Sequence, residues 1–178
     1  YGTAASIDTP KLNSSGYHKP VGAPAYAPPE AFCGFAGNRP LGRLADSYAL
    51  GSLLFGLFNA RPFHQVLHAD TRFNVVVGAV ASALAGVTSE TEMRRIWGEQ
   101  MRRFSAISGP PEIEGPGHTV PASVSAIVRD LYARLVRFDF NDRLGDLQFA
   151  VQRVDCALRT LSNAQKQAKE LERKRILR

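Results

Sequence analysis

The chain of 178 residues contains only two cysteines, one tryptophan and no long apolar run. Cys33 and Cys156 lie far apart without C-x-x-C spacing, which indicates neither a disulfide framework nor a cysteine zinc site. No segment reaches the roughly 18 uninterrupted apolar residues that a membrane helix needs. The sequence also lacks an initiator Met and a signal peptide. We therefore expect a cytoplasmic protein and an N-terminus that is an interior point of a longer gene product.

Apolar residues recur at helical spacing, whereas alternating apolar and polar runs are scarce, so the sequence predicts a mainly α fold. One helix is expected to begin after a cap at Asp46 and to be buried, because its apolar positions cover most of its circumference. A capping box at Ser89 and a cap at Asp146 predict two further helix starts. The remaining helical patterns cover residues 65–84 and 123–138.

The formal net charge of +6 is concentrated at the C-terminal end, where six basic residues face two acidic ones. We interpret this end as a solvated helix face or a coiled-coil extension, with membrane contact as a less favoured alternative and no nucleic-acid partner. His64 and His68 stand four residues apart, but the H-E-x-x-H glutamate is missing, so no metal site is predicted there.

A short segment near the N-terminus carries the most specific motif. It reads Gly22-Ala23-Pro24-Ala25-Tyr26-Ala27-Pro28-Pro29-Glu30. This run resembles the end of the activation segment of eukaryotic-type Ser/Thr protein kinases, Gly-Thr-x-x-Tyr-x-Ala-Pro-Glu. Tyr26, Pro29 and Glu30 match, whereas Ala23 stands where Thr is typical. In the same register Tyr1 and Gly2 resemble the residues that follow the magnesium-binding Asp of that family.

Two later motifs occur in the order that the family shows. Asp46-Ser47-Tyr48-Ala49-Leu50-Gly51 is similar to the Asp-x-Trp-Ser-Leu-Gly that starts the long central helix of the large lobe. The resemblance implies that Asp46 accepts hydrogen bonds from the backbone of the catalytic loop. It also implies a buried ion pair between Glu30 and Arg143, which lies just before the last helix. Gly51 ends this motif.

The resemblance also identifies what the sequence does not contain. No Gly-rich phosphate loop, V-A-I-K strand or H-R-D-L catalytic loop occurs in it, so no catalytic residue and no ATP or magnesium ligand is expected in this chain. ATP and Mg²⁺ are expected for the complete kinase. The implied partners are a missing N-terminal kinase half, supplied by the same gene product or by a separate chain, and a protein substrate or regulator.

The resemblance further implies a division of the chain into an activation segment at 1–30, a helical C-lobe at 31–160 and a basic helical extension at 161–178. Thr9, Ser14 and Ser15 lie where activating phosphorylation commonly occurs in the family. The alternative is that they are ordinary polar residues of a loop. Ala23 has no hydroxyl to bond the catalytic Asp and Lys of the family. Two hypotheses follow: part of an active Ser/Thr kinase, or a pseudokinase or regulatory binding module.

Overall fold

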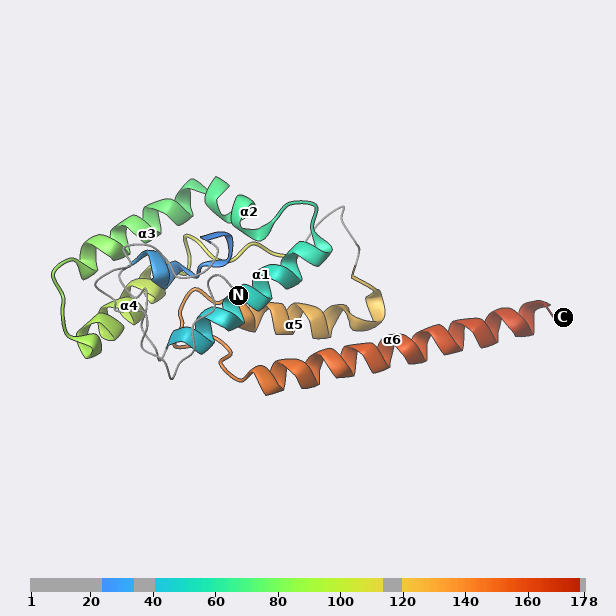
Figure 1. The fold of residues 1–178 in the computed structure, drawn as a ribbon. Coiled ribbons are helices and arrows are strands. Elements are labelled where there is room, and N and C mark those ends of the chain that lie inside the picture. Colours follow the sequence, from blue (N-terminus) through green and yellow to red (C-terminus); the bar gives the residue numbers. More distant parts are fainter. Residues whose placement is uncertain (1–23, 34–40, 114–119, 177–178) are drawn as a thin grey trace.

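The computed structural model describes residues 24–33, 41–113 and 120–176, and these form helices and no strand (Figure 1). The prediction of a mainly α fold is therefore confirmed. The α-helices in chain order are α1 (Gly42–Phe58), α2 (Phe63–Ala69), α3 (Thr71–Leu84), α4 (Glu90–Phe104), α5 (Ser125–Leu135) and α6 (Leu147–Ile176). Short 3-10 helices are η2 (Pro24–Tyr26), η3 (Pro29–Phe32) and η5 (Ala122–Val124).

Two of the predicted helix starts are confirmed. The Ser89 side chain accepts a hydrogen bond from the Glu92 backbone N–H at the start of α4. The Asp146 carboxylate accepts from the backbone N–H groups of Gln148 and Phe149 at the start of α6. Each cap satisfies donors that have no partner inside the helix, which fixes where the helix begins.

Three helix boundaries differ from the prediction. The prediction that Asp46 caps α1 is wrong, because α1 already begins at Gly42 and Asp46 lies inside it. Residues 65–84 do not form one helix, since Asp70 ends α2 and its side chain caps α3 through the Arg72 backbone N–H. The helix expected at 123–138 is split between η5 and the shorter α5. In each case the apolar periodicity of the sequence continues across the observed helix boundary, so the pattern does not indicate where the helix begins or ends.

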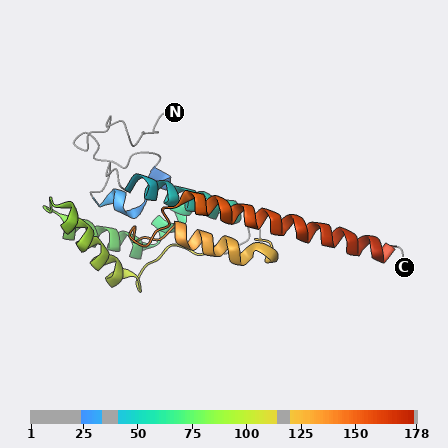
Figure 2. The same cartoon turned by 90° about the horizontal axis from the view of Figure 1, so that it is seen from below.

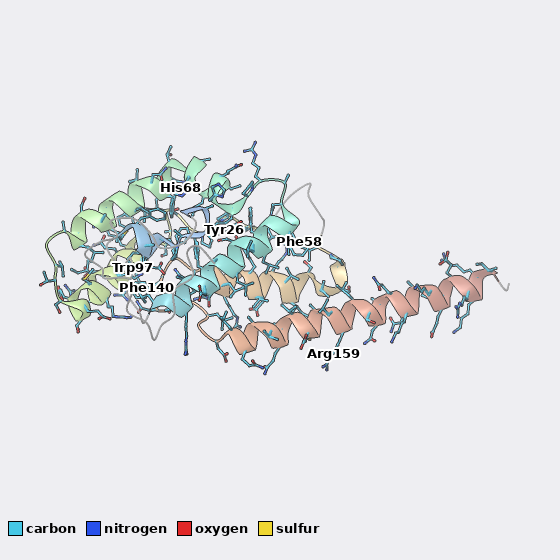
Figure 3. All side chains as sticks on the ribbon, viewed as in Figure 1. Tyr26, Phe58, His68, Trp97, Phe140 and Arg159 are labelled. Atoms are coloured by element: carbon cyan, nitrogen blue, oxygen red, sulfur yellow. The ribbon has the colours of Figure 1, made fainter. Side chains whose placement is uncertain are left out.

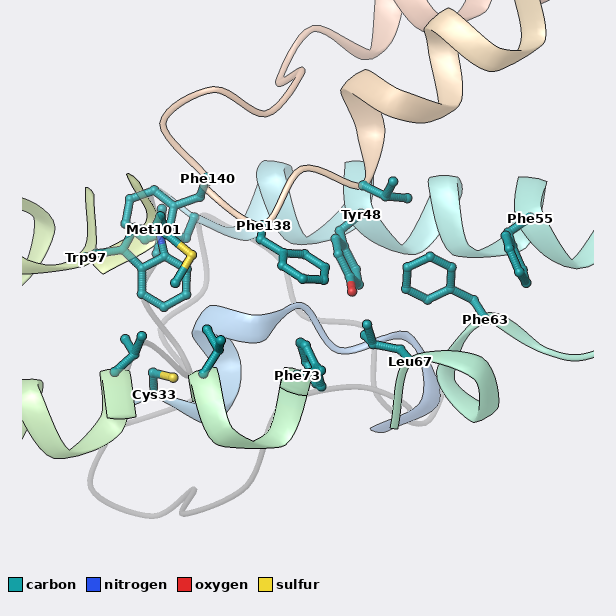
Figure 4. Close-up of a cluster of buried hydrophobic side chains, with 14 of the residues drawn as sticks. Cys33, Tyr48, Phe55, Phe63, Leu67, Phe73, Trp97, Met101, Phe138 and Phe140 are labelled. Atoms are coloured by element: carbon teal, nitrogen blue, oxygen red, sulfur yellow. The ribbon is translucent and has the colours of Figure 1, made fainter. Parts of the chain in front are cut away.

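An aromatic cluster forms the centre of the fold (Figure 4). Phe55 and Phe63 stack edge to face with ring centroids 5.3 Å apart, and Trp97 lies parallel to Phe140 at 5.1 Å. The apolar side of α4 contributes Trp97 and Met101 to this cluster, so it packs in the core. The cluster joins α1, α2, α3 and α4 to the turn between α5 and α6.

Helix α1 packs closely against α5 because Gly51 has no side chain. A Cβ atom at this position would lie 2.4 Å from Val136 Cγ1 and 2.9 Å from Leu135 Cβ. Both distances are far below van der Waals contact, so a larger residue would force the end of α5 away from α1. Gly51 therefore sets the separation of these two helices.

Only one side of α1 is buried. Ser47, Tyr48 and Phe55 are inside, whereas Leu50, Leu53 and Leu57 are 41%, 51% and 61% exposed. The expectation that α1 is buried all round is wrong for this chain, since no described element covers the side that carries the three leucines. We call this exposed side, Leu50, Leu53 and Leu57, the leucine face of α1.

Helix α6 packs against α5 and η5 and then extends well beyond the other helices (Figure 2). Its only buried residue is Ala150, which packs with Leu131 and Leu135 of α5. Leu147, Val151, Val154 and Leu158, although apolar, are exposed, so the packed side of α6 is not centred on them. Within the described residues, no helix has both the length and the apolar character needed to cross a membrane.

We predict opposite effects for two glycine substitutions in α1. Gly51→Ala should lower the free energy of unfolding by about 1–3 kcal/mol because its Cβ meets α5. Gly56→Ala should raise it by about 0.5–1 kcal/mol, since nothing lies within 4 Å of that Cβ and Ala favours the helix. Urea titration followed by helical circular dichroism measures both. Equal effects for the two variants would contradict the close packing of α1 on α5.

Candidate functional site

The segment that carries the sequence motif lies against the helical body at several points. It contains η2, which contacts α1 and α2, and η3, which contacts α3. Pro29 occupies the first position of η3, where its missing N–H and fixed φ suit the start of a helix. Backbone hydrogen bonds from Ala31 to Pro28 and from Cys33 to Glu30 close the turn. This geometry directs the Glu30 side chain into the interior, where it is 2% exposed.

The ion pair predicted between Glu30 and Arg143 is present. The two terminal nitrogens of the Arg143 guanidinium, Nη1 and Nη2, donate to the two carboxylate oxygens of Glu30 in a bidentate arrangement, with Nη2 and Oε2 2.9 Å apart. The two residues are 113 positions apart in the sequence. A bidentate pair fixes the relative orientation of its partners as well as their distance. It therefore ties the motif segment to the turn that precedes α6.

Every N–H group of the Arg143 guanidinium has an acceptor. Besides Glu30, it donates to the backbone carbonyls of Arg137 at 2.8 Å, Leu44 at 3.2 Å and Phe138 at 3.4 Å. The guanidinium therefore links η3, the start of α1 and the end of α5 at one point. A guanidinium has five donors in a fixed plane, which a lysine cannot replace.

The surroundings of the ion pair are apolar and closed to water. The Arg143 side chain is 0% exposed, and its guanidinium carbon lies 5.0 Å from the centre of the Tyr48 ring. Burial raises the pKa of the Tyr48 hydroxyl, and nearby Arg143 partly offsets this rise. Burial, with a smaller contribution from Glu30, raises the pKa of the Cys33 thiol to about 12. Tyr48 and Cys33 therefore stay neutral beside the ion pair.

Asp46 and Tyr26 differ from the ion pair because they are exposed. Asp46 is on α1, and no described residue donates a hydrogen bond to its carboxylate. Tyr26 in η2 is 40% exposed and is labelled in Figure 3. Both side chains can therefore accept contacts from a segment or molecule outside the described residues. Sequence reasoning did assign Asp46 to such a contact, through the resemblance alone.

Several predicted site residues lie outside the described part of the chain. They are Tyr1, Gly2, Thr9, Ser14, Ser15, Gly22 and Ala23. The roles that the resemblance implies for them stay predictions.

Of the two histidines of α2, His68 takes part in aromatic packing. The His68 ring lies edge-on to Phe32 and Phe73, with centroid distances of 5.9 and 5.4 Å. Among the described residues, no three histidine, cysteine, aspartate or glutamate side chains converge as metal ligands would. His68 therefore connects η3 to α3 through its ring.

Sequence reasoning missed most of the partners of the ion pair. The carbonyl groups of Leu44, Arg137 and Phe138 carry no side-chain signal, because any residue presents a carbonyl. Tyr48 was recognised only as a motif position, although its ring forms one wall of the Arg143 site. An aromatic residue six positions after the start of α1 was the one available signal, and it is too common to be specific.

Comparison of this chain with protein-family models, curated proteins and solved structures gives no match. Its functional interpretation therefore depends on its own residues and their geometry.

We predict that the Glu30–Arg143 ion pair dominates the stability of this region. Glu30→Gln should lower the free energy of unfolding by about 3–5 kcal/mol, because it leaves the buried Arg143 charge uncompensated. The matched control is Glu99→Gln, which removes an exposed carboxylate paired with Arg95 and should cost at most about 1 kcal/mol. Urea denaturation compares the two variants. A loss for Glu30→Gln no larger than that of the control would contradict the role assigned to the pair.

Proposed function

We propose that this chain is the C-terminal part of the large lobe of a Ser/Thr-type protein kinase. In that role it supplies the activation segment, the docking surface for a protein substrate and the helical scaffold. The observation that carries the proposal is the buried bidentate pair of Glu30 and Arg143. It joins the motif that resembles the end of an activation segment to the arginine that the resemblance implies as its partner. The order of elements supports it, since α1 contains the Asp46 to Gly51 motif and α6 begins just after Arg143.

Phosphoryl transfer requires groups that this sequence does not contain. The Lys and phosphate loop that hold ATP, the aspartate that orients the substrate hydroxyl and the magnesium ligands must come from residues outside it. The contribution of this chain is positioning. Its activation segment is held against the helical body at Glu30, and Asp46 presents an unoccupied carboxylate at the surface of α1.

The leucine face of α1 supports the existence of a complementary segment. Leu50, Leu53 and Leu57 are spaced three and four residues apart, so they form one continuous stripe along the helix. Apolar stripes of this kind are usually covered by another element or by a partner. The resemblance implies that the covering element is the N-terminal half of the kinase, whose catalytic loop would also reach Asp46.

A pseudokinase or regulatory module is the second candidate, and Ala23 is the residue that favours it. A threonine hydroxyl is typical at this position and bonds the catalytic residues, whereas alanine offers no donor or acceptor. In this case the same helical body would bind proteins without transferring phosphate.

The proposal predicts kinase activity when this chain is combined with the complementary N-terminal half, in one polypeptide or as a separate chain. Transfer of the γ-phosphate of ATP to a Ser/Thr substrate protein is measured with radiolabelled ATP. Asp46→Ala should lower kcat about a hundredfold through misplacement of the catalytic loop. Asp155→Ala is the matched control, since Asp155 is also an exposed acidic residue but lies on α6, and it should leave kcat unchanged. Absence of transfer together with an upstream sequence that lacks the Lys and H-R-D motifs would favour the pseudokinase.

A second prediction concerns the leucine face of α1. The purified chain alone should self-associate, and the double variant Leu53→Gln, Leu57→Gln should be less associated because it removes the centre of the stripe. Leu171→Gln is the control, since Leu171 is 63% exposed but lies far along α6. Static light scattering measures the mean mass at several concentrations. A monodisperse wild-type monomer with a cooperative thermal transition would contradict the prediction.

A further inference from the structure

A cavity of about 330 Å³ lies at the C-terminal end of α4. Two of its lining residues, Arg137 and Phe138, also provide backbone carbonyls to Arg143 of the buried ion pair. It is bounded by α3, by the segment that follows α4 and by the turn between α5 and α6. Its volume is at the lower end of the range of about 300–1,000 Å³ that small-ligand sites occupy. The cavity can therefore hold one ring system with a short side chain.

The floor and the rim of the cavity differ in chemistry. Val76, Met101 and Phe138 form an apolar floor and are 3%, 8% and 8% exposed. Four charged residues that are more exposed than the floor also line the cavity, and we call them its rim: Arg102, Arg137, Asp139 and Asp142. A site with an apolar floor and a few polar groups at its edge selects ligands that combine an apolar body with one polar group.

The two arginines of the rim have unused hydrogen-bonding capacity. Neither guanidinium donates a hydrogen bond to a described residue, and the one ion pair between rim groups joins Arg137 and Asp142 at 3.8 Å. By contrast, Asp139 already accepts two hydrogen bonds from Asn141. The guanidinium of Arg102 lies beside this turn, since a Cβ on Gly98 would be 3.6 Å from both Arg102 Nη1 and Asn141 Nδ2. The open donors at the rim therefore favour an anion.

The charge of that anion is limited by the two aspartates. Two arginines and two aspartates give the rim no net formal charge, so the overall charge of the rim does not attract an anion and a preference for one has to come from hydrogen bonds to a single guanidinium. A single carboxylate matches the fork of one guanidinium and adds only one negative charge.

Ser108 gives a second and independent sign of a binding site. It lines the cavity and is 8% exposed, and its hydroxyl is buried without a hydrogen-bond partner in the described part of the chain. Buried hydroxyls normally have a partner, because leaving one unpaired is unfavourable. A ligand in the cavity that Ser108 lines could supply the missing partner.

From these observations we propose that this cavity binds a small ligand that joins an aromatic-sized apolar group to one carboxylate. The apolar group lies on Val76, Met101 and Phe138, the carboxylate accepts hydrogen bonds from Arg102, and the Ser108 hydroxyl bonds a polar atom of the ligand. This binding does not depend on the kinase role proposed above, because the ligand would contact neither Glu30 and Arg143 nor the leucine face of α1.

Three matched probes test the site: indole-3-propionate, its alcohol 3-(indol-3-yl)propan-1-ol and tryptamine. They carry the same ring with an acid, a neutral group or an amine. Binding is followed by methyl NMR of Val76 and Met101, in the chain alone or, if it needs one, in its complex with the complementary segment. The acid should shift both signals and bind about tenfold more tightly than the alcohol, as expected for one charge-assisted hydrogen bond. Equal binding of acid and alcohol, tighter binding of the amine, or no shift at these methyl groups would overturn the proposal.

Two variants and one control locate the contacts. Arg102→Gln should abolish the preference for the acid, and Ser108→Ala should weaken binding of the acid without lowering the urea midpoint, since it removes an unpaired hydroxyl. Arg103→Gln is the control. It carries the same charge change on the neighbouring residue, whose guanidinium lies over the Phe104 ring and does not line the cavity. An Arg103→Gln effect as large as that of Arg102→Gln would show that general charge, not this site, attracts the acid.

Discussion

The buried ion pair of Glu30 and Arg143 is the interaction on which the arrangement of this chain depends. Two opposite charges are removed from water, and this is tolerable because all guanidinium donors and both carboxylate oxygens are satisfied. Breaking any one contact would leave a charge in an apolar interior. The pair therefore imposes one geometry on three separate parts of the chain: the η3 turn, the start of α1 and the turn before α6.

A second constraint is the division of α1 into two sides. One side fits closely against α5 at Gly51 and contributes Tyr48 and Phe55 to the aromatic cluster. The other side exposes three leucines and the carboxylate of Asp46. A helix with apolar groups on both sides is typical of the centre of a domain, where other elements cover both sides. In this chain the described elements cover only one side of α1. The proposed kinase role explains both sides with one missing segment.

The sequence allowed the ion pair and the caps to be predicted because these depend on side chains with specific chemistry. Ser89 and Asp146 mark helix starts by their own hydrogen bonds, and the Glu30–Arg143 pairing followed from the family resemblance. Features that depend on packing were not predictable. The exposure of Val151 and Leu158 depends on which side of α6 meets α5, and apolar periodicity alone does not identify the contacting side.

Hydrogen–deuterium exchange of the η3 turn tests the central claim most directly. The backbone N–H groups of Ala31 and Cys33 are bonded only within this short turn, so their protection depends on its attachment to the helical body. If Arg143 holds the turn, these amides should exchange as slowly as the interior of α1, and Glu30→Gln should release them while α1 stays protected. Exchange of the wild-type turn at the rate of an unfolded peptide would contradict the account.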